Sequence, residues 1–428
     1  MRIHPEAQER NTRLAALAPA VAKALSPLGQ RAFFPKGIPF QAGQAGGCKI
    51  NATIGQITDG AGNPIPLAPL KEKLASFPAK DAFLYSPIQG RARARETWHA
   101  KLLKEDARMA QVALPNVSSG ICHALSMAAD MFFAAGETLI IPDLYWDNYE
   151  QVFLMRLEGD YQTYPFYNAQ GGFNLEGLKA TIARQGAKAH VLLNFPSNPS
   201  GYSPTPVELK AIAEALIEAS KDRTLVVYCD DAYHGLVFEE SATSKSLFFD
   251  LAEAATSGRA PNLIPVKCDG VTKELSFFGG RVGFITFGVQ KDAATILSDK
   301  AMSLVRAGIG SPVGLSQYLM EEELLDPRHE AEFDRLRQIL AARYRKLKEL
   351  LSKPTPHWTV FPFNAGCFCL LELREGLDAE AVRQALIHDE SVGVVSQGSR
   401  YLRLAFCSLH DDAIEPLVEA LRRVCEKM

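Results

Sequence analysis

The sequence predicts an α/β protein built around a mostly parallel β-sheet with helices on both faces, together with a second, smaller domain. The chain has 428 residues, more than a single hydrophobic core usually organises. Between about residues 90 and 310, short apolar runs alternate with amphipathic stretches. The runs have no polar face, which is typical of parallel strands covered by helices on both sides.

The individual elements follow from this alternation. The predicted strands cover residues 138–142, 189–194, 225–230 and 283–287. Amphipathic stretches between them predict helices at 206–219 and 291–305. Residues 327–352 indicate one long charged helix leading to a smaller α+β unit, with strands near 366–373 and 401–406.

The N-terminal part has a different character. Residues 1–30 are rich in alanine with interspersed charged residues, and they predict a helical arm. Residues 31–70 are rich in glycine and proline and predict a loop-dominated segment that crosses the surface.

Composition excludes several classes of protein. The chain is 47% hydrophobic and 22% charged with a formal net charge of −3, whereas a nucleic-acid partner usually requires a basic excess. No apolar run reaches the roughly 18–20 residues of a membrane span. The charged first residues lack an apolar signal core, so we expect a cytoplasmic protein. The eight cysteines are scattered, and Cys367 and Cys369 alternate along a strand without the spacing of zinc ligands, so no metal is expected.

Polar residues follow the predicted strands at the edge where parallel sheets bind ligands. Asn198, in a Pro/Gly segment after residues 189–194, either serves an ordinary turn or donates its amide to a ligand oxygen. Asp230 ends the next strand and is either a helix cap or a carboxylate that keeps a pyridine nitrogen protonated. Tyr233 could then donate to the phenolic oxygen of the same ring, while Asp231 faces elsewhere.

A lysine, an arginine and a helix start complete the set. Lys273 follows a short apolar run, and Arg281 lies eight residues later in a glycine-rich turn. Such a lysine can form a Schiff base with an aldehyde cofactor while the arginine holds its phosphate. Ser119 and Gly120 open a helix whose N–H groups either bind phosphate or serve only as a cap. The aromatic residues of segment 142–149 either cover a cofactor ring or form a core cluster. The order of these segments indicates pyridoxal phosphate.

Together these segments resemble the class I/II aminotransferases of the fold-type I pyridoxal-phosphate enzymes, most like the aspartate and aromatic aminotransferase group. The resemblance covers roughly residues 45–410 and rests on the Asn-Pro-x-Gly, Asp-x-Ala-Tyr and Lys-x7-Arg motifs. It implies a mostly parallel seven-stranded sheet sandwiched by helices, and a smaller α+β domain formed by the N- and C-terminal parts. The implied divisions are 1–60 for the arm and part of the small domain, 61–325 for the large cofactor-binding domain and 326–428 for the small C-terminal domain.

The resemblance implies a role for each matching residue. Lys273 corresponds to the Schiff-base lysine, which also carries the substrate proton. The residues implied to bind the cofactor are Ser119, Gly120, Ile121 and Arg281 at the phosphate, Asp230 at the ring nitrogen, Asn198 and Tyr233 at the ring oxygen, and Trp146 on the ring face. Tyr145 is the alternative stacking residue. Tyr85 resembles the tyrosine that reaches the phosphate in the neighbouring subunit, which implies a homodimer with shared active sites.

Substrate binding is implied at three further positions. Arg403 matches the arginine that binds the substrate α-carboxylate in this family, and Arg400 is the alternative. Gly55 lies in a segment that resembles the one that covers the bound substrate in this family. Arg306 falls where dicarboxylate-specific members carry a second arginine from the partner subunit, although an ordinary surface arginine is the alternative.

The chain departs from the family pattern at Gly270, where a serine often stands, and Thr272 or a backbone amide would have to compensate. The loop 142–149 also carries Asp147 and Asn148, so its packing against substrate stays open. The implied activity is transfer of the amino group of aspartate, glutamate or an aromatic amino acid to a 2-oxo acid such as 2-oxoglutarate, by ping-pong kinetics.

Two other functions compete with this one. A pyridoxal-phosphate β-lyase acting on cysteine conjugates would use the same residues. A ligand-sensing regulator would also share the fold, but the 30 or so residues before the Gly-rich segment are too few for a DNA-binding module. The joint presence of Lys273, Asp230 and Arg403 favours an enzyme.

Overall fold

In the computed structural model, which describes residues 3–428, a seven-stranded sheet has the order β2-β8-β7-β6-β5-β3-β4. The strands are β2 (Asn116–Ser118), β3 (Thr138–Pro142), β4 (Asp160–Tyr164), β5 (Lys188–Asn194), β6 (Thr224–Asp230), β7 (Leu263–Gly270) and β8 (Gly283–Phe287). Strands β4, β3, β5, β6 and β7 pair in parallel, while β8 runs antiparallel to both β7 and β2. The predicted mostly parallel sheet is therefore confirmed.

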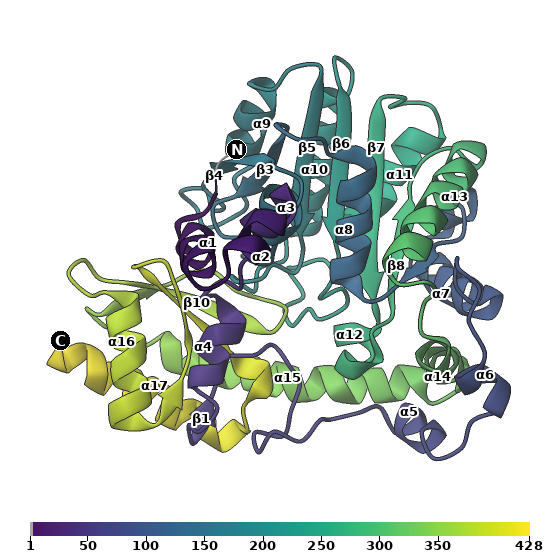
Figure 1. Cartoon of the computed structure of the whole chain (residues 1–428). Helices are drawn as coiled ribbons and strands as arrows, with labels where there is room; N and C mark the ends of the chain where they lie inside the picture. The colour runs from purple at the N-terminus through teal and green to yellow at the C-terminus, as the bar shows by residue number, and fades with distance from the viewer. Residues whose placement is uncertain (1–2) are drawn as a thin grey trace.

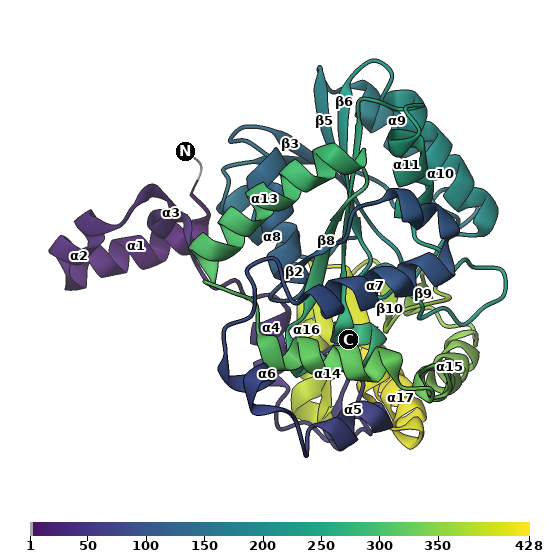
Figure 2. The ribbon, with the colours of Figure 1, turned by 90° about the vertical axis from the view of Figure 1, so that its right-hand side faces the viewer.

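Helices cover both faces of this sheet (Figures 1 and 2). On one face lie α9 (Leu175–Ala183), α10 (Pro206–Ala219) and α11 (Leu247–Thr256), and on the other lie α8 (Ile121–Phe132) and α13 (Lys291–Gly308). The central strand β6 is buried on both faces from Leu225 to Asp230, which explains its unbroken apolar run. Among residues 3–428, no helix combines the length and the apolar character needed to cross a membrane.

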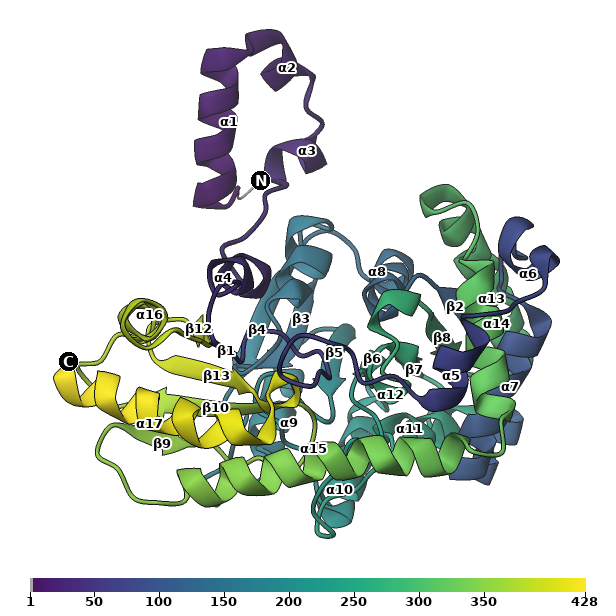
Figure 3. The same ribbon diagram turned by 90° about the horizontal axis from the view of Figure 1, so that it is seen from below.

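A second, antiparallel sheet has the order β12-β13-β10-β9. Its strands are β9 (Trp358–Val360), β10 (Phe368–Leu373), β12 (Val395–Gln397) and β13 (Tyr401–Ala405). Helices α16 (Ala379–Ala385) and α17 (Asp411–Lys427) pack in this unit, and α15 (His329–Leu351) runs along its edge towards the larger sheet (Figure 3). β1 (Ile50–Asn51) pairs with β11 (Val392–Gly393), so the N- and C-terminal parts build the smaller α+β unit together, as predicted.

The N-terminal residues form a helical arm that projects from the body of the molecule (Figures 2 and 3). It consists of α1 (Pro5–Leu17), α2 (Pro19–Ala24) and α3 (Pro27–Arg31). Each helix has proline as its first residue, a position where the missing N–H costs no hydrogen bond. Proline spacing therefore divides the predicted arm into three helices.

The loop prediction for residues 31–70 is partly wrong, because α4 (Ile38–Gln44) and the start of α5 (Ala68–Lys73) lie there. Contacts with a distant strand hold α4 in place. The Gln41 amide donates to the carbonyl of Ser396 at 3.0 Å and accepts from its N–H at 2.9 Å. Such a partner cannot be seen in the local sequence.

Four further α-helices complete the described part of the chain. They are α6 (Ala79–Phe83), α7 (Ala92–Glu105), α12 (Val271–Glu274) and α14 (Gly314–Leu325). The short α12 directly follows β7, so it lies at the carboxyl edge of the parallel strands.

Candidate active site

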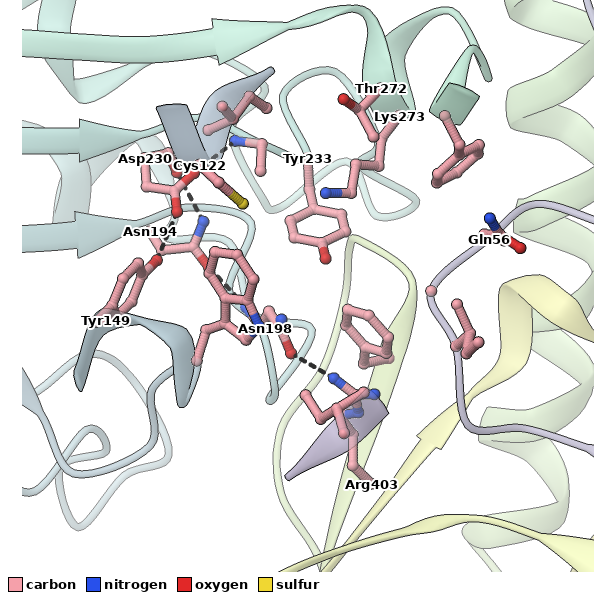
Figure 4. A pocket seen from close by; sticks show the side chains of 18 of the residues that line it. Gln56, Cys122, Tyr149, Asn194, Asn198, Asp230, Tyr233, Thr272, Lys273 and Arg403 are labelled. Atoms are coloured by element: carbon pink, nitrogen blue, oxygen red, sulfur yellow. Dashed lines mark hydrogen bonds between the residues drawn. The ribbon is translucent and has the colours of Figure 1, made fainter. Parts of the chain in front are cut away.

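A cavity of about 270 Å³ lies at the carboxyl ends of the parallel strands, where the two sheets face each other (Figure 4). Strand ends of the larger sheet contribute Asn194 and Asp230, and α12 contributes Lys273. The smaller sheet contributes Phe368 from β10 and Arg403 from β13. The cavity thus collects residues that are distant in the sequence, as the edge of a parallel sheet allows.

Asp230 lies buried at the floor of the cavity. Its carboxylate accepts a hydrogen bond from the Tyr149 hydroxyl at 2.6 Å and one from the N–H of Ala232 at 3.1 Å. Burial raises the pKa of Asp230 to about 6, although the Tyr149 hydrogen bond and the Lys273 charge oppose that rise. The Asn194 amide donates to the Asp230 carbonyl at 2.7 Å and thereby ties β5 to β6.

Lys273 projects into the cavity beside Tyr233 (Figure 4). Its amine lies 4.7 Å from the centroid of the Tyr233 ring. Burial lowers the pKa of Lys273, while the Asp230 carboxylate across the cavity acts in the opposite direction. A lysine of this kind reaches its neutral, nucleophilic form more readily than a lysine on the surface.

Arg281 and the start of α8 form a positively polarised wall. The guanidinium packs against Gly120, where a side chain would collide with it. Ile121 and Cys122, in the first turn of α8, line the cavity together with Arg281. A helix N-terminus beside an arginine suits a phosphate group. Ser119 lies next to this wall but does not line the cavity, and its N–H donates to Nδ1 of His123 at 3.0 Å.

Gly270 has no room for a side chain. A Cβ atom at this position would lie 2.6 Å from the carbonyl oxygen of Val282 and 2.7 Å from Cα of Gly283. This backbone crowding explains why no serine stands here. Thr272, two residues later, lines the cavity.

Arg403 lies at the opposite end of the cavity, 1% exposed. Its guanidinium donates to Oδ1 of Asn198 at 3.0 Å and to the carbonyl of Thr53 at 2.6 Å. The guanidinium carbon lies 4.2 Å from the centroid of the Phe368 ring, against which Gly55 also packs. The protein therefore holds this guanidinium in one orientation, as bidentate binding of a carboxylate requires.

The rival Arg400 lies elsewhere. It forms an ion pair with Glu372, and its side chain is 64% exposed. The structure therefore brings Arg403, and not Arg400, to the cavity.

Trp146 and Tyr145, the two candidates for stacking on the cofactor ring, face different cavities. Trp146 lines the cavity and meets the Tyr149 ring edge-to-face, with 5.6 Å between centroids. Tyr145 instead donates to Glu150 at 2.5 Å and faces a neighbouring cavity. Asp147 also faces that neighbouring cavity and packs against Gly37, while the Asn148 amide points towards the Cys122 sulfur at 4.0 Å.

Tyr85 and Arg306, two further predicted site residues, also do not line the cavity of their own chain. Tyr85, between α6 and α7, is 96% exposed. Arg306 is exposed in the last turn of α13. Both positions are available to a second subunit.

Sequence reasoning missed the partner of Asp230. Tyr149 was recognised only as one aromatic residue among several, although its spacing of three residues from Trp146 could have placed both on one side of a helical turn. Asn194, Cys122 and the Thr53 carbonyl were also missed. The first two lie beside recognised motifs, whereas the carbonyl carries no sequence signal.

The donor set fits pyridoxal 5′-phosphate. Arg281 and the α8 N-terminus match a phosphate, and Lys273 matches an aldehyde. The Asp230 carboxylate, whose pKa burial raises to about 6, matches a protonated ring nitrogen.

The chain is similar to known aminotransferases in sequence and in fold. An aspartate/prephenate aminotransferase of Cereibacter sphaeroides is 26% identical over 378 residues, which cover 85% of this chain and 89% of that protein. A crystal structure of an aminotransferase from Anaerococcus prevotii has a TM-score of 0.77 at 20% identity and covers 91% of this chain and 96% of its own.

A kynurenine aminotransferase of Pyrococcus horikoshii, solved in complex with PMP, has a TM-score of 0.76 at 17% identity, covering 96% of this chain and 99% of its own. The family model of the class I and II aminotransferases matches residues 48–421. The chain therefore belongs to the class I and II aminotransferases and is a pyridoxal-phosphate-dependent transferase.

Proposed function

We propose that the enzyme moves the amino group of an L-amino acid to a 2-oxo acid such as 2-oxoglutarate, with both substrates using the same cavity in a ping-pong scheme. One observation carries the proposal. The Lys273 amine, the Asp230 carboxylate and the Arg403 guanidinium, far apart in the chain, all face one cavity.

In this proposal the cavity residues hold pyridoxal phosphate from every side. Arg281 and the first turn of α8 bind the phosphate, and Asp230 pairs with the ring nitrogen. Asn198 and Tyr233 bind the ring oxygen, and Trp146 covers the ring face. When bound, the cofactor supplies the electron sink that stabilises negative charge at the substrate α-carbon.

Lys273 and Arg403 act on the substrate itself. Arg403 binds the α-carboxylate and orients the α-hydrogen towards Lys273. Because burial lowers the pKa of Lys273, its neutral amine can take up the α-proton, hold it and return it. Trp146 and Phe368 exclude water from the apolar part of the cavity.

The proposed donors are aspartate, glutamate or an aromatic amino acid. Support comes from the name of the Cereibacter sphaeroides relative and from the apolar wall that Ile38, Ile54 and Phe368 form. A distal carboxylate requires a second cation, and in this proposal Arg306 of a partner subunit provides it.

We infer a homodimer from exposed apolar residues. Phe83, Leu84 and Tyr85 are consecutive and are 82%, 69% and 96% exposed. Large apolar side chains gathered in this way are typical of a protein interface. In the dimer, Tyr85 would reach the phosphate in the neighbouring cavity.

The decisive experiment is a panel of amino donors against 2-oxoglutarate, followed by the absorbance of the bound cofactor. Lys273→Ala is expected to abolish transfer, and full activity in this variant would overturn the proposal. Release of ammonia and pyruvate from a cysteine conjugate without any 2-oxo acid would favour a β-lyase instead.

Arg306→Ala tests the distal carboxylate. It should reduce activity with aspartate far more than activity with phenylalanine. Lys300→Ala, which removes an exposed cation of the same helix, is the matched control. An equal loss with both donors would contradict the role of Arg306.

A further inference from the structure

Three residues that face the cavity are each followed in the sequence by a titratable residue that faces away from it. Asp231 follows Asp230, His234 follows Tyr233, and Glu274 follows Lys273. None of the three second residues lines the cavity. They belong instead to ion-pair networks behind it.

Lys101, on α7, joins two of these residues. Its amine lies 2.7 Å from Oε2 of Glu274 and 2.7 Å from Oε1 of Glu105. The other carboxylate oxygen of Glu105 lies 2.5 Å from Nε2 of His234. A continuous chain of contacts therefore runs from the neighbour of Lys273 to the neighbour of Tyr233.

Asp231 belongs to a second, fully buried group. It pairs with Lys267 and accepts from the Ser246 hydroxyl at 2.6 Å. Lys267 also lies 3.3 Å from Asp269, which accepts from the Trp98 indole at 3.1 Å. This group anchors the end of β6 to β7.

Burying the charged groups of the Lys101 network costs desolvation free energy. Glu274 is 2% exposed, and its Oε1 atom has no hydrogen-bond partner in the described part of the chain. Burial raises the pKa of Glu274, with the charge on Lys101 acting against it. Buried ion pairs of this kind often contribute no more stability than apolar residues of the same size. A role in positioning neighbouring residues explains the Lys101 network better than a role in stability does.

We propose that Lys101, together with Glu105, positions Lys273 and Tyr233 relative to each other from behind the cavity. Helix α12 has four residues and ends at Glu274, so a short segment carries Lys273 and depends on this anchor. The contact set by the network is the amine over the Tyr233 ring at 4.7 Å (Figure 4). The inference rests on the proposed role of Lys273 as the proton carrier.

In this proposal the network acts on the position of Lys273 and not by direct charge contact with its amine, because other charged or titratable groups surround that amine. Those groups are Asp230, Cys122, Cys367 and Arg281. The groups that face Glu274 are Lys101, His234, Asp269 and Glu105. A separate cavity of about 590 Å³ borders Lys101, Glu105, His234 and Glu274 on the side away from the active site, so water can reach the network if the anchor is lost.

The test replaces Lys101 by methionine in the full-length holoenzyme. Lys188→Met is the matched control, because Lys188, Glu137 and His190 form a second Lys–Glu–His cluster with contacts of 2.9 Å that does not border the active-site cavity. Two quantities are measured in each variant. The first is kcat against KM, and the second is the pH dependence of amine labelling at Lys273 after the cofactor has been removed.

We expect Lys101→Met to lower kcat about tenfold while KM changes less than about twofold, because Arg403 is untouched. We also expect the labelling midpoint of Lys273 to rise by at least about half a pH unit, since a loosened amine regains water. Lys188→Met should change neither quantity, and Lys101→Arg should restore both.

Equal kcat and equal labelling midpoints in Lys101→Met and the wild type would overturn the proposal. Equal losses of kcat in both methionine variants, without a labelling shift, would overturn it as well. If Lys101→Met fails to fold, Glu105→Gln breaks the same chain of contacts and carries the same expectation. The labelling midpoint does not depend on activity, so this inference fails separately from the proposed function of Lys273, which Lys273→Ala tests.

Discussion

Replacing Tyr149 by phenylalanine removes the hydroxyl that donates to Asp230 at 2.6 Å and keeps the ring. A hydrogen bond to a charged group contributes about 1.5–3 kcal/mol, and about 1.4 kcal/mol corresponds to one pKa unit. The pKa of Asp230, about 6 in the intact protein, should therefore rise by about 1–2 units. At pH 7 the carboxyl group would change from about nine-tenths ionised to between about a half and a tenth ionised.

The assay is the affinity for pyridoxamine 5′-phosphate between pH 5 and 9, because this form of the cofactor makes no covalent link to lysine. The ionised carboxylate is the binding form, so affinity falls as the pH drops through the pKa of Asp230. We expect the midpoint of this fall near pH 6 in the wild type and about 1–2 units higher in Tyr149→Phe. Titration of the cofactor itself is common to both proteins and cancels in the comparison.

Tyr145→Phe serves as the control, since this hydroxyl bonds Glu150 and not Asp230. An unchanged midpoint in Tyr149→Phe would refute the reasoning, even if the affinity were lower at every pH.

Three further predictions concern single positions. Gly270→Ser should lower the free energy of unfolding by about 1–3 kcal/mol, because its Cβ would lie 2.6 Å from the Val282 carbonyl oxygen; a wild-type urea midpoint would contradict this. Asp230→Asn should raise the melting temperature of the cofactor-free protein at pH 7, because ionising a carboxyl with a folded pKa of about 6 rather than 3.8 costs about 3 kcal/mol. That cost is absent below the unfolded pKa and complete above the folded one, so the gain should vanish near pH 3; equal melting at pH 7 would argue against it. Arg403→Lys should lower kcat/KM roughly 10–100-fold for every donor, and unchanged values across the donor panel would exclude Arg403 as the carboxylate ligand.

The most regular elements were predictable from the chain itself. The predicted strands 138–142 and 283–287 and the helix 206–219 match β3, β8 and α10 residue for residue. β3 and β8 are buried along nearly their whole length and therefore show a continuous apolar run. α10 begins with a capping box at Thr205. The local sequence therefore indicates where these elements begin and end. β4 was missed because it is an edge strand whose residues are mostly exposed and polar.

The candidate site was predictable where its residues follow such strands. Asp230 is the last residue of β6, and Asn198 and Lys273 come shortly after β5 and β7. The carboxyl ends of parallel strands meet at one edge. The hydrogen bond from Tyr149 and the link between Lys101 and Glu274 were not predictable. Each contact joins segments that come together only in the folded chain, and the spacing of apolar and polar residues in the sequence does not indicate such contacts.

Arg400 and Arg403 illustrate the difference between what the sequence determines and what packing decides. Arg403 lies within β13, whereas Arg400 lies in the turn just before it, and successive side chains along a strand face opposite sides. Which side meets the cavity depends on how β13 packs between β10 and β12 and on the Asn198 and Thr53 oxygens that hold Arg403. The sequence by itself thus determined the parallel sheet and the kinds of side chain at its edge. Tertiary structure decided which of those side chains face one another, because burial and partner contacts arise only when distant segments pack.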